Sequence, residues 1–250
     1  MSAYPTGTVT FLFTDIEGST KLLQQLGDRY GAVVAEHRRL LRDAFAAVGG
    51  REVDTQGDAF FYSFQRASDA VAGAVAGQHA LHDHEWPDGV QVKVRMGLHT
   101  GEPAVGDEGY VGMDVVRAAR ICEAAHGGQV LLSETTRALI GSEFPAGVSV
   151  RDLGEQKLKD VKAERLYQLD LGGEPQYFPL LRTEPGRIDF GERISRHVES
   201  MVEAQMESVF AGGKPPTAKL AGLTAFGLIT LAVFVVLLVG IAFLVKAAFF

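Results

Sequence analysis

The chain has 250 residues, of which 46% are hydrophobic and 22% are charged, and its formal net charge is −7 at pH 7. This length fits one sizeable domain with an additional segment, and the composition excludes a disordered or collagen-like chain. The net acidity argues against a general nucleic-acid-binding surface, and a single cysteine, Cys122, excludes an intramolecular disulfide and a multi-cysteine zinc site.

The first two thirds of the chain alternate between strand-like and helix-like patterns. Runs rich in β-branched and aromatic residues predict strands at 8–14, 52–55, 59–64, 90–98, 130–132 and 165–169. Helical spacing of apolar residues predicts helices at 20–26, 28–48, 67–82 and 109–125. The order βαββαβ of the first elements predicts an α+β sandwich, in which helices cover one antiparallel-rich sheet.

The C-terminal part of the chain has a different composition. Residues 220–245 carry no charged side chain, and as a helix they would be ~39 Å long, enough to cross a ~30 Å hydrocarbon core. Two lysines precede this stretch and one follows it, a bias that favours a cytoplasmic N-terminal domain. We therefore expect a single-pass protein of the cell membrane, with its domain in the cytoplasm and one C-terminal transmembrane helix.

Residues 173–219 are predicted to form a linker and a juxtamembrane amphipathic helix. Prolines between 175 and 185 are typical of a linker, and apolar residues from Ile194 to Val209 recur near helical spacing. This stripe fits a short coiled coil with a second chain, and equally a helix that lies on the membrane or on the domain. The predicted domains are therefore 1–172, 173–219 and 220–245.

Two aspartates are the first candidates for chemistry. Asp15 follows the first apolar strand in FTDIEGST, and Asp58 follows Gly57 in the turn of DTQGD. Alone, Asp15 is equally well read as a helix cap, and Asp58 alone is better read as an ordinary turn residue. In a βαββαβ sheet, however, the first strand and the following hairpin lie side by side at the centre. The two carboxylates together therefore predict a site for a pair of divalent cations, the arrangement that clamps a phosphoryl transfer.

The residues after Asp15 add a candidate anion site. The backbone N–H groups of residues 17–20 open a helix, and such groups are a natural place for phosphate oxygens. Gly18 allows the backbone to come close to a ligand.

Four motifs resemble the class III nucleotidyl cyclases, which make cyclic AMP or cyclic GMP. They are FTDIEGST, VDTQGDAFFYSF, RMGLHTG and YVGMDVVRAARI, and the resemblance runs from about Thr8 to Leu171. The sequence is most similar to the actinobacterial branch, whose cyclase domains often accompany regulator modules. The resemblance implies a ferredoxin-like βαββαβ cyclase sandwich, two Mg²⁺ or Mn²⁺ ions per site, and a dimer whose sites combine residues of both chains.

The metal half of the family's site is matched in this sequence. The resemblance assigns Asp15 and Asp58 as metal ligands, with the carbonyl of Ile16 as an additional ligand. It assigns Arg120 as the arginine that stabilises charge on the α-phosphate, supplied across the dimer from the other chain. The loop that holds the β- and γ-phosphates in the family matches Glu17, Gly18, Ser19 and Thr20.

The half of the site that reads ribose and base is altered. Val116 stands where the family usually has an asparagine that orients the ribose, and Asp54 and Gly109 stand where a lysine and an aspartate read the purine. Glu102 falls where some members place a phosphate-binding arginine. The late lysine that contacts phosphate in the family is matched by Lys157, Lys159 or Lys162.

These observations predict a membrane-tethered nucleotidyl cyclase that acts on ATP in preference to GTP and is weak because of its substituted residues. The rival interpretation is a catalytically degenerate nucleotide-binding or regulatory subunit that pairs with another cyclase chain. The expected partners are ATP or GTP, a second cyclase domain in a homodimer or heterodimer, and the membrane, but no nucleic acid.

Overall fold

The structure, a computed structural model, describes residues 4–106, 109–172 and 176–183. By its contacts the chain divides into two units, residues 1–203 and 204–250. The predicted membrane helix at 220–245 lies outside the described residues, as does the predicted juxtamembrane helix. No helix in the described part of the chain is both long and apolar enough to span a bilayer.

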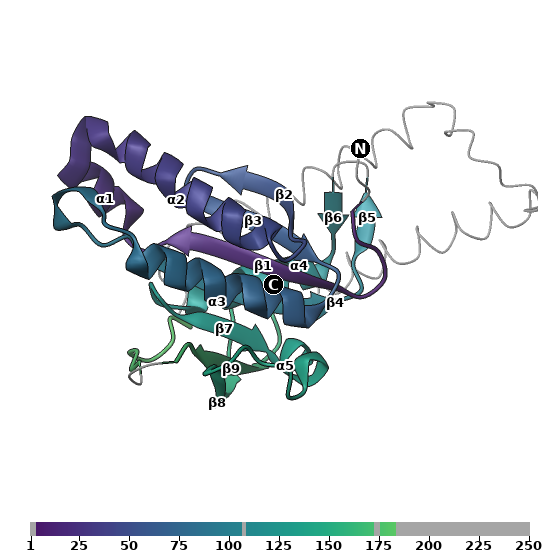
Figure 1. Cartoon of the computed structure of the whole chain (residues 1–250). Helices are drawn as coiled ribbons and strands as arrows, with labels where there is room; N and C mark the ends of the chain where they lie inside the picture. Colours follow the sequence, from purple (N-terminus) through teal and green to yellow (C-terminus); the bar gives the residue numbers. More distant parts are fainter. Residues whose placement is uncertain (1–3, 107–108, 173–175, 184–250) are drawn as a thin grey trace, which may run out of the picture. The chain divides into compact units, whose positions relative to one another are not determined.

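Within the described residues, a seven-stranded sheet with the strand order β2-β3-β1-β4-β7-β9-β8 forms the centre of the domain (Figure 1). Neighbouring strands are antiparallel except β4 and β7, which are parallel. The strands of this sheet are β1 (Val9–Ile16), β2 (Arg51–Gln56), β3 (Ala59–Phe64), β4 (Val94–Gly101), β7 (Val130–Ser133), β8 (Ser149–Gln156) and β9 (Glu164–Asp170). A separate antiparallel hairpin is formed by β5 (Ala104–Gly106) and β6 (Gly109–Val111).

Helices cover both faces of the sheet. They are α1 (Ser19–Leu26), α2 (Tyr30–Ala46), α3 (Ala67–Asp83), α4 (Met113–Ala124) and α5 (Glu134–Ile140), with 3-10 turns at Gly27–Arg29 and Pro87–Gly89. Figure 1 shows α2 and α3 lying across the near face of the sheet, with α4 behind β1. Leu12 of β1 packs in the core under α2 and α3, whereas Phe11 and Phe13 pack with residues of α4. Because side chains alternate along a strand, Asp15 follows Phe11 and Phe13 on the α4 face.

The predicted α+β fold is confirmed, and the order β2-β3-β1-β4 within the sheet is the ferredoxin-like arrangement of a βαββαβ unit. Several element boundaries differ from the prediction. Strand β1 extends to Ile16, so Asp15 lies within the strand rather than after it. The strand predicted from residue 90 begins at Val94, and residues 109–111 form β6 before α4 begins. Gly112 separates β6 from α4 with φ 124°, a backbone conformation that glycine adopts readily. The sequence does not predict strand β8, since its residues SVRDLGEQ are polar and half-exposed at the edge of the sheet.

The described domain continues beyond the predicted boundary at residue 172. The backbone N–H of Arg182 donates to the carbonyl of Ala124 at 3.0 Å, and Leu181 packs against the cluster around Ile121. Residues 176–183, which the prolines predict to be a linker, therefore pack on the end of α4. We call residues 176–183 the C-terminal strap.

Candidate functional site

Asp15 and Arg95 form a buried ion pair at the end of β1. The two residues are directly opposite each other on β1 and β4, and Nε of Arg95 donates to Oδ2 of Asp15 at 2.9 Å. Their side chains are only 9% and 12% exposed. Burial acts to lower the pKa of Arg95, but the carboxylate of Asp15 outweighs it and raises that pKa above its ordinary value. The guanidinium therefore stays charged next to the predicted metal ligand.

Asp58 lies in the β2–β3 turn and reaches the same end of β1. Its Oδ2 accepts a hydrogen bond from the backbone N–H of Ile16 at 3.2 Å. The turn requires Gly57, whose φ is 60°, and a guanidinium nitrogen of Arg38 donates to the Gly57 carbonyl. The structure thus brings Asp58 against the backbone that follows Asp15, as the sheet topology predicts.

The oxygen atoms at this end of β1 fit a divalent cation. Carboxylate and carbonyl oxygens from Asp15, Asp58 and Ile16 are the hard ligands that Mg²⁺ and Mn²⁺ prefer. In the described residues no group of three or more histidine, cysteine or carboxylate side chains is arranged to hold a metal ion. An ion at this site would therefore need further oxygens from water or from a bound phosphate, which is how Mg²⁺ usually binds beside nucleotides.

The loop after β1 leads directly into α1, whose first turn follows Asp15 and Ile16 in the chain. Gly18 has φ 70°, and its carbonyl accepts from the N–H groups of Lys21 at 2.9 Å and Leu22 at 3.0 Å. The amides of Ser19 and Thr20 precede these first intrahelical bonds, so they belong to the end of the helix that attracts anions. The amide of Glu17 differs from the expectation, because it donates to the carbonyl of Lys93 at 2.8 Å.

Tyr30 of α2 lies beside this loop and Arg38 of the same helix lies beside the β2–β3 turn, although no sequence motif points to either. Burial and the carboxylates of Asp58 and Asp15 raise the pKa of Tyr30, while a hydrogen bond with the side chain of Ser19 acts in the opposite direction. Tyr30 therefore lies within electrostatic reach of both predicted metal ligands. No local sequence pattern predicts this position of Tyr30. It arises from the fold, since α2 returns along the sheet beside the β2–β3 turn.

Arg120 is buried on α4 and is paired within its own chain. Its guanidinium donates to Glu123 at 2.8 Å and to Asp160 at 3.1 Å. Arg95 in turn donates to the backbone carbonyl of Glu123 at 3.4 Å. Arg120 is therefore connected to the predicted metal ligand Asp15 through Glu123 and Arg95. Asp160 belongs to the β8–β9 loop, which also carries the candidate phosphate lysines Lys157, Lys159 and Lys162.

The substituted positions lie on β2, β6 and α4. The carboxylate of Asp54 accepts from the side-chain amide of Gln56 at 2.8 Å. A Cβ at Gly109 would lie 3.5 Å from Val53, so β6 approaches β2 next to Asp54. Val116 is half-buried in the first turn of α4. Ribose and base recognition at these three positions stays a prediction.

Glu102 lies at the opposite end of β1 from Asp15. Its carboxylate accepts from Thr8 at 3.4 Å, just beyond the pairing of Val9 with Gly101. This is the start of β1, about 20 Å along the strand from Asp15 at ~3.3 Å per residue. The basic residue that pairs with Asp15 is Arg95, which lies at the other end of β4.

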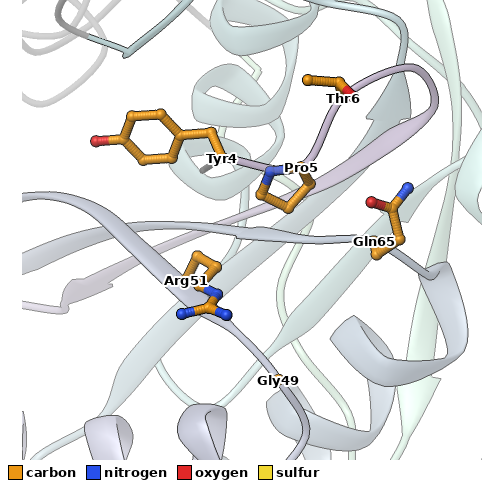
Figure 2. Close-up of a pocket in the computed structure, with 6 residues that line it drawn as sticks. All are labelled: Tyr4, Pro5, Thr6, Gly49, Arg51 and Gln65. Carbon is orange, nitrogen blue, oxygen red and sulfur yellow. The ribbon is translucent and has the colours of Figure 1, made fainter. Parts of the chain in front are cut away.

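A pocket lies at the start of β1, the end away from Asp15. It is bordered by the segment before β1 and by the start of β2, and Figure 2 shows its lining residues Tyr4, Pro5, Thr6, Gly49, Arg51 and Gln65. Because β1 separates this pocket from Asp15, we assign it no part in the site.

Comparison with known proteins places the domain in a family. Residues 1–171 match the family model described as adenylate and guanylate cyclase catalytic domain. An uncharacterized protein of Mycobacterium tuberculosis is 37% identical over 182 residues, which cover 72% of this chain and 61% of that protein. An adenylate cyclase of Podospora anserina is 30% identical over 221 residues, covering 66% of this chain and 10% of that protein. The matched part is thus less than two thirds of these relatives.

Solved structures show the same fold. A structure of adenylate cyclases from Trypanosoma brucei in their monomeric state matches with a TM-score of 0.69 and 26% identity, covering 75% of this chain and 98% of that one. The guanylate cyclase domain of RhGC from Catenaria anguillulae, in complex with GTP, matches in fold with a TM-score of 0.59 and 20% identity, covering 67% and 98%. The chain therefore belongs to the adenylate and guanylate cyclase catalytic domain family.

Proposed function

We propose that the chain is a nucleotidyl cyclase that converts ATP to the 3′,5′-cyclic nucleotide and pyrophosphate. The observation that carries this proposal is the meeting of Asp15, Asp58 and the N-terminus of α1 at one end of β1. Two carboxylates beside the first amides of a helix fit a site for a cation-bound triphosphate. Membership in the cyclase family supports the same reaction class.

The residues of the chain would act as follows. Asp15, Asp58 and the Ile16 carbonyl would hold two Mg²⁺ or Mn²⁺ ions, which activate the ribose 3′-hydroxyl and balance the charge of the triphosphate. The amides at the start of α1 would bind the β- and γ-phosphates. Arg120 would stabilise charge that develops on the α-phosphate, and Arg95 would contribute a second guanidinium beside Asp15.

The reaction balances without a further reactant. The ribose 3′-oxygen forms a bond to the α-phosphorus, and the bond from that phosphorus to the bridging oxygen of the β-phosphate breaks. Pyrophosphate leaves, and the proton of the 3′-hydroxyl passes to solvent. The protein contributes position and charge, which supply most of the rate in such transfers.

Turnover is expected to be slow, and discrimination between ATP and GTP is expected to be poor. Val116 cannot hydrogen-bond to the ribose, so the 3′-oxygen is less well oriented. The carboxylate of Asp54 accepts from Gln56, and it can equally accept from the amino group of adenine or of guanine. GTP is therefore the second candidate substrate.

The proposal includes a dimer and a membrane tether. Each site would take Asp15 and Asp58 from one chain and Arg120 from the other, and residues 220–245 would hold the domain at the cytoplasmic face of the cell membrane. The actinobacterial branch remains the proposed subgroup. A regulatory subunit that completes another cyclase chain is the alternative, and the observation in its favour is valine at position 116.

The test uses the purified full-length chain with manganese and either ATP or GTP, and the product is identified by chromatography. We expect cyclic nucleotide and pyrophosphate in equal amounts, and loss of both in Asp58→Asn. The matched control is Asp43→Asn, which changes an exposed carboxylate on α2 that pairs with Arg39. This variant should keep wild-type turnover. Binding without turnover, together with activation of a complete cyclase domain, would support the regulatory alternative. Absence of nucleotide binding would refute the cyclase proposal.

A further inference from the structure

The C-terminal strap is anchored to the turn that follows α4. Besides the backbone bond from Arg182 to Ala124, an imidazole nitrogen of His126 lies 3.0 Å from the carbonyl oxygen of Leu180. The ring of Phe178 is nearly parallel to that of His126, with an angle of 9° and centroids 6.4 Å apart. Backbone, ring and side-chain contacts therefore fix the path of the strap over this turn.

The strap places Arg182 next to Glu17, the first residue of the predicted phosphate-binding loop at 17–20. A guanidinium nitrogen of Arg182 forms an ion pair with Oε1 of Glu17, and Nδ1 of His126 lies 3.9 Å from the same oxygen. The carboxylate also lies against Gly127, where an added Cβ would come within 2.8 Å of Oε2. The Glu17 amide is bonded to Lys93. These contacts restrain both the side chain and the backbone of Glu17 beside the start of α1.

A carboxylate in this position works against the proposed substrate. Glu17 directly precedes the amides that would take the β- and γ-phosphates, and like charges repel most strongly where solvent is partly excluded. The Glu17 side chain is 28% exposed and that of Arg182 is 45% exposed, so solvent screens the pair only in part. Arg182 offsets the charge that would otherwise oppose the triphosphate.

We propose that the C-terminal strap is part of the triphosphate site, with Arg182 as a positioning residue that neutralises and holds Glu17. The inference rests on the proposed function, because it assumes that the loop at residues 17–20 binds phosphate. Beyond the proposed function, the inference states that nucleotide binding depends on a segment that follows the predicted domain boundary at residue 172. The dependence is confined to the β- and γ-phosphates, since Glu17 acts on that end of the nucleotide.

The test measures binding of manganese with ATP, and of AMP, to the full-length chain by calorimetry. Arg182→Ala should weaken ATP binding about fivefold, the size expected for a half-exposed charge pair, and should leave AMP binding within twofold of wild type. Arg182→Lys should keep most of the ATP affinity because it retains the positive charge. Adding Glu17→Gln to Arg182→Ala should restore ATP affinity, because the uncompensated carboxylate is then absent.

A matched control is Arg42→Ala. Arg42 pairs with Glu52 on another part of the domain, with side chains 45% and 32% exposed, so this variant breaks a comparable pair at a distance from the loop. It should leave ATP binding unchanged. If it weakens ATP binding as much as Arg182→Ala does, the effect is general and the inference fails.

The remaining outcomes separate the inference from the proposed function. If the wild type binds ATP and Arg182→Ala binds it equally well, the inference fails and the proposed function stands. If Arg182→Ala weakens AMP and ATP alike and Glu17→Gln does not restore binding, the strap has a purely structural role and the inference fails. If the wild type binds no triphosphate, the proposed function fails and the inference with it.

Discussion

Asp15→Ala should destabilise the domain strongly as well as remove a proposed metal ligand. The variant leaves the guanidinium of Arg95 charged in a site where its side chain is only 12% exposed. Removing one partner of a buried ion pair typically costs about 3–5 kcal/mol, because the remaining charge lacks its counter-charge. That is a large part of the total stability of about 5–15 kcal/mol that a domain has. Loss of activity in this variant alone would therefore not identify a metal ligand.

The stability effect can be measured by denaturant unfolding, followed by the fluorescence of Trp86. Trp86 is the single tryptophan of the chain, and it packs on the core with its Nε1 donating to Leu81 at 3.1 Å. Adding Arg95→Met to Asp15→Ala should recover at least half of the lost free energy, since the uncompensated charge is then gone. An unfolding free energy of Asp15→Ala within about 1 kcal/mol of wild type would refute the reasoning.

Three further predictions concern the site and the core. Val116→Asn should raise turnover about tenfold or more, measured as cyclic nucleotide formed per chain, because it supplies a ribose contact; an active enzyme left unchanged would contradict the assignment of this position. Mixing Asp15→Asn chains with Arg120→Ala chains should restore part of the activity through one intact composite site, and hybrid dimers without recovery would argue against shared sites. Burial lowers the pKa of His37 from 6.5 to about 4, so the unfolded chain takes up a proton first and wild-type stability should fall by about 3 kcal/mol between pH 6.5 and 4. His37→Leu should lack that part of the loss in Trp86 unfolding curves, and identical curves would contradict it.

The central elements of the fold could be predicted because they depend on local pattern. The run from Val9 to Phe13 is buried at every position, since β1 lies in the middle of the sheet with helices on both faces. The meeting of Asp15 and Asp58 could also be predicted, because the βαββαβ order places the β2–β3 turn next to the end of β1. In both cases neighbouring residues and element order were sufficient.

The remaining parts of the site depend on pairs that are distant in the sequence. Arg95 lies in a strand-like motif, and only its register opposite Asp15 gives its charge a partner. Glu17 and Arg182 are 165 residues apart, and the strap that joins them lies among prolines, so its sequence resembles a linker. Periodicity and turn signals describe short stretches of chain, so neither pair leaves a local signal.

The proposed metal half and the proposed ribose- and base-reading half of the site differ in how closely they are coupled to folding. Asp15 is paired inside the sheet and Asp58 is bonded to the backbone of β1, so changing either also perturbs the fold. Val116 is half-buried on a helix and Asp54 bonds to its close neighbour Gln56, so substitutions at these two positions cost the fold little. Substitutions at Val116 and Asp54 can therefore alter the proposed ribose and purine recognition while the fold and the two proposed metal carboxylates are kept. Similarity of fold consequently supports binding of a cation-bound triphosphate more strongly than it supports fast turnover, and the two must be measured separately.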